Sequence, residues 1–432
     1  MIHWSRHIAV LLLLVANVAV SGEVLWSRAI APNVVAVYGR GLVERPYDTV
    51  TATMDGEKLD EIKEPFPVHH ARQYFQLWQC DKPGELTLES KNVKHTCTVE
   101  PFDCGSIGPD VFGAIDGTVT GPAFKAGFHF PGRLTIRGDH VRLVNCTIEG
   151  GILLDGCSDV QIVDCEVHGD RPVDATFKSL ERVSWYKCNF FCNDPQIGEP
   201  RRLVGPDGAI VFCRTHNCNR PLVLDEWTGP QLNQVVFGHW SDTCPMDTYR
   251  NERDGYVYHC QLVDKVQGVA AGSFAKLDRK TCTRYGTYAG KHMYAPGYLL
   301  ANRATGEWSR IVSVDEHEDS LIVKMDRNVK ATGRMVELWV GSIRTNCAHI
   351  SNTSSGGRFG LTYWGSTQDE VVFNNTFDGC QQPVQVRSEK GVDWSDRMSF
   401  GRNRAFGSLV KEPVWYTPGG SALPELVGVQ EW

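Results

Sequence analysis

The sequence predicts an all-β protein, a right-handed parallel β-helix with a small N-terminal β-sandwich-like domain and an inserted antiparallel β subdomain. Three observations predict this fold. A short apolar phrase returns along the chain, strand-like segments alternate apolar and polar residues, and glycine reaches 42 of 432 residues while helix signals are few.

The recurring phrase is an apolar strand, a polar break, a Cys or Asn, any residue, and another apolar residue. It is clearest at residues 141–148, 160–167 and 183–190, and fainter at 255–262 and 370–377. Alignment puts these residues in one column: Cys146, Cys165, Cys188, Cys260 and Asn375, joined on weaker flanks by Cys213, Asn352 and Asn403. Copies roughly 19 to 28 residues apart cannot bury their own apolar side chains, so they must stack and share a core.

Each coil is expected to contain three short strands, clearest at residues 152–154, 160–163 and 165–167. Asn145, Asp164 and Asn374 fall at the corner between the second and third strands, where Asn and Asp tolerate a left-handed backbone. The alternation predicts these core residues: Leu143, Ile148, Ile162, Val167, Trp185, Phe190, Val372 and Phe377.

This pattern resembles the right-handed, pectate-lyase-like superfamily of secreted polysaccharide-processing enzymes, over about residues 105 to 410. The handedness follows from that resemblance and from the crossover bias of parallel strands. The paired Asp-Asp and Gly-His-Gly motifs of its pectin-type hydrolases are missing, as is the Arg-His-Gly segment of its chondroitinase- and alginate-lyase-like group. The resemblance therefore implies only where a site would lie: in a groove along one face, built by loops after third strands and by residues on or after first strands.

The expected order of domains follows from where the phrase starts and stops. Residues 1–21 form a signal peptide, 23–104 a small β-sandwich-like domain or a cap over the first coil, and 105–280 the first part of the β-helix. Residues 281–341 break the phrase and form the inserted subdomain, 342–410 the last coils, and 411–432 a C-terminal tail.

Export is predicted by the first residues. Arg6 and His7 precede an apolar run from residue 8 to 20, and small residues follow it, as in a secretory signal peptide. The run is short for a membrane span, and no later stretch is apolar enough to be one. The net charge of −7 argues against nucleic acid as the main partner, whereas an anionic polysaccharide would need only a local basic cleft.

Fifteen cysteines in an exported chain predict disulfides, although the odd count leaves at least one unpaired. The column cysteines are expected to be buried small hydrophobes. Disulfides are expected among Cys80, Cys97 and Cys104, or between Cys192 and Cys218. No metal site is predicted, because residues 213–218 lack a second pair of ligands at zinc spacing.

One column of candidate site residues lies three places after the Cys/Asn column. Its members are Glu149, His168, Phe191, His216, Asp242 (if His239 holds the column place), Val263, Ser355 and Asp378. Coils rise by about 4.8 Å, so ionisable groups would line up there as carboxylate pairs or as a carboxylate beside His. The alternative is that turns are polar in any β-helix.

Candidate substrate contacts follow two first strands. Asp225, Glu226 and Trp227 come after residues 221–224, and Tyr363 and Trp364 end the equivalent strand several coils later. A Trp ring would stack on a sugar while the acids accept hydroxyls or transfer protons. The alternatives are an ordinary acidic turn and Trp side chains packed under loops.

Candidate catalytic residues are Asp242, Asp247, Arg250 and Lys265. A uronate lyase needs a base for the proton beside the carboxylate and a cation for the developing charge. Lys265 and Arg250 would supply that cation, or calcium would, and the sequence identifies no other cofactor. Solvated turn charges are the alternative.

The leading hypothesis is an exported polysaccharide-active enzyme, a lyase or glycosidase. The alternative is a non-catalytic glycan-binding or structural surface or matrix protein of the same fold. The outward middle residues of the first strands change from apolar to polar along the chain, in the order Leu153, Val223, Ala270, Thr362 and Gln385. An apolar outward face is expected to be covered, so the open groove is expected over the later coils.

Overall fold

The structure is a computed structural model. It describes residues 22–43, 48–63, 73–82, 84–90, 94–100, 102, 110–111, 113, 117–195, 197–225, 228–243, 254–260, 263–302, 305, 307–329, 334–380, 382–387, 395–396, 398–406 and 414–416. The expected signal peptide lies outside these residues. Among the described helices, none is long and apolar enough to cross a membrane.

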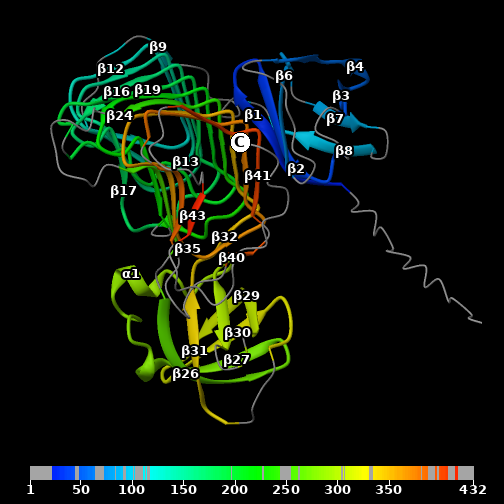
Figure 1. Ribbon diagram of the computed structural model, residues 1–432, viewed down its shortest axis with the longest axis vertical. Coiled ribbons are helices and arrows are strands. Elements are labelled where there is room, and N and C mark those ends of the chain that lie inside the picture. The colour runs from blue at the N-terminus through cyan, green and yellow to red at the C-terminus, as the bar shows by residue number, and fades with distance from the viewer. Residues whose placement is uncertain are drawn as a thin grey trace, which may run out of the picture.

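The predicted parallel β-helix is confirmed, and its stacked coils form most of the molecule (Figure 1). Second strands build a long parallel sheet: β9 (Asp110–Val111), β11 (Ala123–Ala126), β13 (Leu134–Val144), β15 (Ile152–Val163), β18 (Ser184–Tyr186), β20 (Ala209–Val211), β23 (Val235–Phe237), β33 (Ala348–Ile350), β37 (Val371–Phe373) and β41 (Ser399–Gly401). Third strands build another: β12 (His129–Phe130), β14 (Thr147–Ile148), β16 (Glu166–Gly169), β19 (Asn189–Cys192), β21 (Arg214–Cys218), β24 (Trp240–Thr243), β34 (Thr353–Ser355), β38 (Thr376–Asp378) and β42 (Arg404–Phe406).

First strands stack on one further side of each coil. In the early coils they are β10 (Thr118–Thr120), the first halves of β13 and β15, and β17 (Val173–Ala175). In the later coils they form a five-stranded parallel sheet: β22 (Leu222–Asp225), β25 (Asp254–Cys260), β35 (Phe359–Gly365), β39 (Gln382–Arg387) and β43 (Val414–Tyr416). The expected tail therefore contributes a strand. A short sheet of β32 (Arg344–Thr345), β36 (Thr367–Gln368) and β40 (Ser395–Asp396) lies at the turn that follows the first strands.

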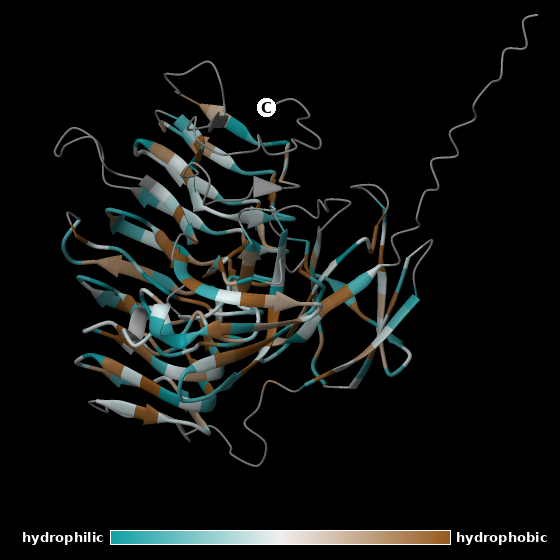
Figure 2. Ribbon diagram, turned by 90° about the horizontal axis from the view of Figure 1, so that it is seen from below, coloured by the Kyte–Doolittle hydropathy of each residue, from teal (hydrophilic) through white to brown (hydrophobic). Residues whose placement is uncertain are grey.

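The corners and the core explain why this sequence coils. Asn145, Asp164 and Asn374 adopt left-handed φ angles of 52°, 50° and 56°, as predicted. All eight predicted core residues are buried in one apolar cluster inside the coils. Figure 2 shows the resulting alternation of apolar and polar segments along the stacked strands.

The residues after these corners stack into a ladder. The main-chain N–H of Asn352 donates to Asn375 Oδ1 at 2.9 Å, and that of Asn375 to Asn403 Oδ1 at 3.0 Å. His239 holds the equivalent place and donates its N–H to Asn352 Oδ1 at 2.8 Å. The placement of Cys260 in this column is wrong, because Cys260 ends β25, a first strand.

The N-terminal sandwich has two four-stranded sheets. One contains β1 (Glu23–Ala31), β2 (Val34–Arg40), β6 (Gln73–Gln79) and β5 (Asp60–Glu61), and the other β4 (Glu57–Lys58), β3 (Thr51–Met54), β7 (Gly84–Glu89) and β8 (Lys94–Val99). It lies beside the coils (Figure 1), where Phe75 packs 5.0 Å from Phe237 and Trp26 donates to the Asn233 carbonyl at 2.9 Å. It thus covers the outer face of the second-strand sheet, not the end of the helix as a cap would.

The inserted subdomain is a closed antiparallel barrel below the coils in Figure 1. Its elements are β26 (Val263–Ala271), β27 (Phe274–Asp278), η3 (Arg279–Thr281), α1 (Tyr288–Lys291), β28 (Leu299–Asn302), β29 (Glu307–Glu316), β30 (Ser320–Met325) and β31 (Val336–Gly341). Residues 263–280 therefore belong to the barrel and not, as expected, to the helix. Because β26 follows β25 closely, the barrel is inserted directly after a first strand.

The predicted disulfide between Cys192 and Cys218 is present and joins the ends of β19 and β21. Cys80 and Cys97 are free thiols, and Cys104 lies outside the described residues. The column cysteines Cys146 and Cys165 are buried, as expected.

Candidate functional site

The most site-like feature lies on the outer face of the five-stranded sheet. Asp225, His259, Trp364 and Arg387 are in register on β22, β25, β35 and β39. Their strand neighbours Leu224, Tyr258, Tyr363 and Val386 face the core, so alternation directs these four side chains outward. We call the four residues the outer row. It brings together Asp225 and Trp364, two residues that the sequence predicted would share a groove.

Asp225 is held by a basic neighbour. Both of its carboxylate oxygens accept from Arg202 Nε, at 3.2 and 3.1 Å, and the side chain is almost buried. The Asp225 carbonyl accepts a hydrogen bond from the Gln231 amide. A carboxylate fixed in this way is suited to orienting Arg202. It is poorly placed to exchange protons with a substrate.

Trp364 is half-buried between two polar neighbours. The His259 ring lies 5.3 Å from it on one side, and the Arg387 guanidinium 5.0 Å from it on the other. Because β35 runs between β25 and β39, these neighbours flank the indole. Within the described part of the chain, Trp364 Nε1 is buried with no hydrogen-bond partner.

Tyr363 is not a substrate contact, contrary to expectation. Its side chain is fully buried in the coils, and its hydroxyl donates to Glu370 Oε1 at 2.9 Å. Glu370 also accepts from Arg344 Nε at 2.9 Å, and both charged groups are completely buried. Period-2 alternation places only one of two adjacent strand residues outside, and here it is Trp364.

The expected open groove over the middle residues of the later first strands is wrong. Thr362 and Gln385 point outward by register, yet both are buried. Val223 is buried too, as expected of an apolar outward residue. Leu153 on an early coil is only half-buried, which reverses the expected order. Ala270 lies in the barrel core and belongs to no coil.

Of the four predicted catalytic residues, the structure describes Asp242 and Lys265, and these two lie on different elements. Asp242 lies on the third-strand sheet, where its carboxylate is 3.5 Å from His216 Nδ1. Lys265 lies on the barrel, with its ammonium 4.7 Å from the Trp339 ring. Asp247, Arg250, Glu226 and Trp227 lie outside the described residues.

The predicted third-strand column is real except for Val263, which begins the barrel. The rings of His168 and Phe191 stack at 4.6 Å, and those of Phe191 and His216 at 4.7 Å. A stack in register along the coils presents ring edges, not faces, to solvent. We therefore regard it as a packing feature of the sheet.

Sequence reasoning missed Arg387. It included His259 among the charged candidates near Asp242, but at the polar break of the recurring phrase in residues 255–262 and not on a first strand. The signal that could have placed His259 on a first strand is the alternation of Tyr256 and Tyr258, which matches that of Leu361 and Tyr363 in the equivalent strand.

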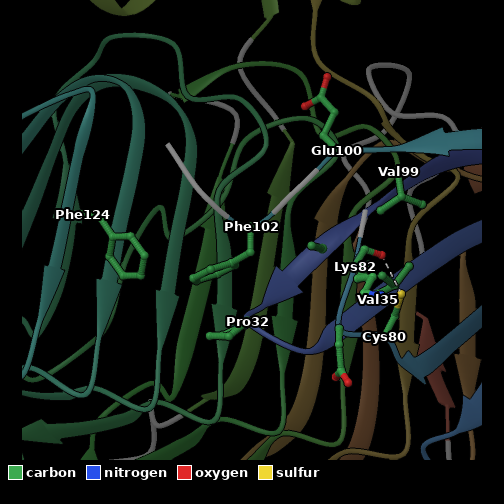
Figure 3. A pocket seen from close by; sticks show the side chains of 10 residues that line it. Pro32, Val35, Cys80, Lys82, Val99, Glu100, Phe102 and Phe124 are labelled. Carbon is green, nitrogen blue, oxygen red and sulfur yellow. Dashed lines mark hydrogen bonds between the residues drawn. The ribbon is translucent and has the colours of Figure 1, made fainter. Parts of the chain in front are cut away.

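A hollow lies where the sandwich meets the first coils (Figure 3). It has a volume of about 240 Å³, and Val35, Val99, Phe102 and Phe124 give it a mainly apolar lining. It lies on the second-strand side of the coils, away from the outer row. Among the described residues, no three His, Cys, Asp or Glu side chains gather as metal ligands.

No protein-family model matches the sequence, and no curated protein sequence does. Among solved structures, a GH87 alpha-1,3-glucanase catalytic domain in complex with tetrasaccharides aligns over 95% of this chain and 91% of that chain, with a TM-score of 0.34 and 8% identity. The same kind of domain in complex with nigerose gives a TM-score of 0.25 over the same shares, also at 8% identity. Likeness at this level carries no functional residue over.

Proposed function

We propose that this chain is an exported carbohydrate-active protein that holds a polysaccharide against the outer row. The observation that supports the proposal is the row itself. An imidazole, a half-buried indole and an exposed guanidinium lie in register at His259, Trp364 and Arg387. Sugars offer hydroxyls to polar groups and C–H faces to aromatic ones, and a row that follows the coils suits a linear chain of them.

Export is part of the proposal. The charged and then apolar start of the sequence supports it. The disulfide between Cys192 and Cys218 also supports it, because structural disulfides persist in oxidising compartments.

Cleavage of the bound chain by a lyase or a glycosidase is the leading form of the proposal. In the lyase form, His259 would take the proton next to the uronate carboxylate. Arg387 would then stabilise the negative charge that develops when this proton leaves. The alternative is binding without cleavage, and one observation favours it: Arg202 engages the one carboxylate of the row, Asp225.

The test is to incubate the purified protein with a panel of uronans and neutral glycans, with and without calcium. Elimination creates unsaturated ends that absorb ultraviolet light, whereas hydrolysis releases reducing ends without that absorbance. Trp364→Ala should weaken binding, while Trp308→Ala on the barrel should not. Trp308 is a matched control, since Arg327 stacks on it at 3.7 Å. Binding without either product would favour the alternative, and no binding to any glycan would refute the proposal.

A further inference from the structure

On the outer side of the first strands in the early coils, exposed cations pair with carboxylates that are buried beneath them. Asp155, which follows the first-strand half of β15, accepts from Arg137 Nε at 2.7 Å and from Thr176 Oγ1 at 2.8 Å. The Lys178 ammonium lies 2.8 Å from the same carboxylate. The stem of Lys178 passes over Gly156, where an added Cβ would come within 2.9 Å of its Cδ.

This arrangement has two layers. The Arg137 and Lys178 side chains are each 56% exposed, whereas Asp155 beneath them is 5% exposed. Hydrogen bonds, first from Lys178 and then from Thr176, lower the pKa of Asp155 to about 2, so the carboxylate stays charged. Two cations on one buried acid leave one positive charge in excess, and solvent meets the cations.

The same arrangement recurs farther along the helix. Glu199 is 6% exposed and pairs with both Arg201 and Arg220, whose side chains are 28% and 27% exposed. The turn before Glu199 is fixed as well, since the Asn219 N–H donates to the Gly198 carbonyl at 2.7 Å. Again two cations share one buried carboxylate.

The stretch between the two clusters is balanced. Arg202 reaches Asp225 at 3.1 Å and Asp174 at 3.4 Å, and Arg171 lies 3.9 Å from Asp174. Asp170, next to Arg171 in the chain, is an exposed acid. The excess positive charge is therefore concentrated at the two clusters.

We infer that Arg137, Lys178, Arg201 and Arg220, here called the cation strip, bind the acidic groups of an anionic polysaccharide. The inference rests on the proposed function and assigns its substrate class. Buried carboxylates hold the cations in place before a ligand arrives, which reduces the cost of ordering them. Two of the four cations are exposed and two are partly exposed, so a ligand in solvent can reach them, and guanidinium groups suit carboxylate and sulfate geometry.

The experiment compares polymers that differ only in charge: dextran with dextran sulfate, and polygalacturonate with its methyl ester. We expect the protein to prefer the charged member of each pair, and the preference to shrink as salt is added. Arg137→Gln with Lys178→Gln should weaken binding of the charged polymers by about tenfold, since each exposed ion pair contributes up to about fivefold. Arg40→Gln on the sandwich, where Arg40 is exposed and paired with Glu23, is the matched control and should change nothing.

A second variant guards against misfolding. Arg137→Gln, Asp155→Asn and Lys178→Gln together remove the buried acid with its two cations, so no unpaired charge is left inside. It should melt near the wild-type temperature and still lose the preference for charged polymers. Equal binding of charged and neutral polymers, with Trp364→Ala weakening both, would overturn this inference and leave the proposed function standing. No binding of any polysaccharide would overturn both, and tighter binding of single-stranded polyuridylate than of dextran sulfate would assign the strip to nucleic acid instead.

Discussion

Acid should destabilise this fold through histidines buried inside the coils. His239 is completely buried, with Nε2 2.8 Å from the Thr215 hydroxyl and Nδ1 2.9 Å from the Tyr256 hydroxyl. Burial lowers its pKa from 6.5 to about 3. His349, 2.5 Å from the Tyr258 hydroxyl, has its pKa lowered well below 6.5, chiefly by burial and then by Arg344.

The sign follows from proton binding. In the folded state His239 stays neutral down to about pH 3, whereas in the unfolded chain it takes up a proton near pH 6.5. The unfolded state therefore binds more protons between these values, and the free energy of unfolding falls as the pH drops through that window. Between about pH 7 and pH 5, one such histidine lowers the free energy of unfolding by about 2 kcal/mol. His349, whose pKa is also lowered by burial, acts in the same direction.

The assay is urea unfolding at about pH 7 and pH 5 for the wild type and for His239→Asn. Asn is the residue that the next coils carry at this place in the ladder, as at Asn352. The variant should be less stable at both pH values, because it loses volume and the bond to Thr215. Its loss of stability between the two pH values, however, should be about 2 kcal/mol smaller than that of the wild type.

The titration of every other group is present in both the wild type and His239→Asn, so it cancels when the two proteins are compared. Burial raises the pKa of Glu370, which acts with the opposite sign, but Glu370 is present in both proteins and cancels in the difference. His317→Asn, in an exposed turn of the barrel, should keep the wild-type pH dependence. If His239→Asn loses as much stability as the wild type between the two pH values, the reasoning about the buried imidazole is wrong.

Three further predictions follow from single contacts. Glu370→Gln should lower the free energy of unfolding by about 3–5 kcal/mol in urea, because it leaves Arg344 charged and buried without its partner. Replacing Cys192 and Cys218 by Ala should cost about 3.5 kcal/mol for a separation of 26 residues, measured against the oxidised wild type. Trp364→Ala should weaken glycan binding at least tenfold in affinity electrophoresis, about the effect of losing a Trp anchor, and a half-buried site should leave the melting temperature nearly unchanged.

Much of the fold could be predicted because its signals are local and repeated. The left-handed corner at Asp164 recurs coil after coil, so residues such as Ile162 and Val167 on either side were placed in the core correctly. The Cys192–Cys218 disulfide could be predicted for the same reason, since both residues end third strands on stacked coils.

The site could be predicted only in part, because it depends on contacts between distant segments. The register that joins Asp225 to Trp364 follows from matching strands, and the sequence indicated it. The ion pair that fixes Asp225 depends on the route of the chain before Arg202, which no local pattern encodes. The burial of Thr362 and Gln385 likewise depends on what covers the sheet.

The error at Cys260 has a physical cause. Tyr256 and Tyr258 alternate as a second strand would, and a Cys follows them, so the pattern alone fits the ladder. In the structure these tyrosines instead hydrogen-bond the core histidines His239 and His349, and the barrel begins soon after.

The barrel insertion coincides with a change in how the coils are held together. Before it the ladder contains cysteines, and the N–H of Cys146 meets Cys165 Sγ at 3.3 Å, a weak acceptor. After it the ladder contains asparagines, and the Asn375 side chain both donates to Asn403 Oδ1 at 2.9 Å and accepts from Asn352. An amide satisfies a buried N–H better than a thiol does, because its oxygen is the stronger acceptor and its nitrogen can donate onward. Coils that resume after a long insertion lack a short covalent link to the coils before it. The stronger hydrogen bonds of the asparagine ladder therefore hold together the coils that the chain connects least directly.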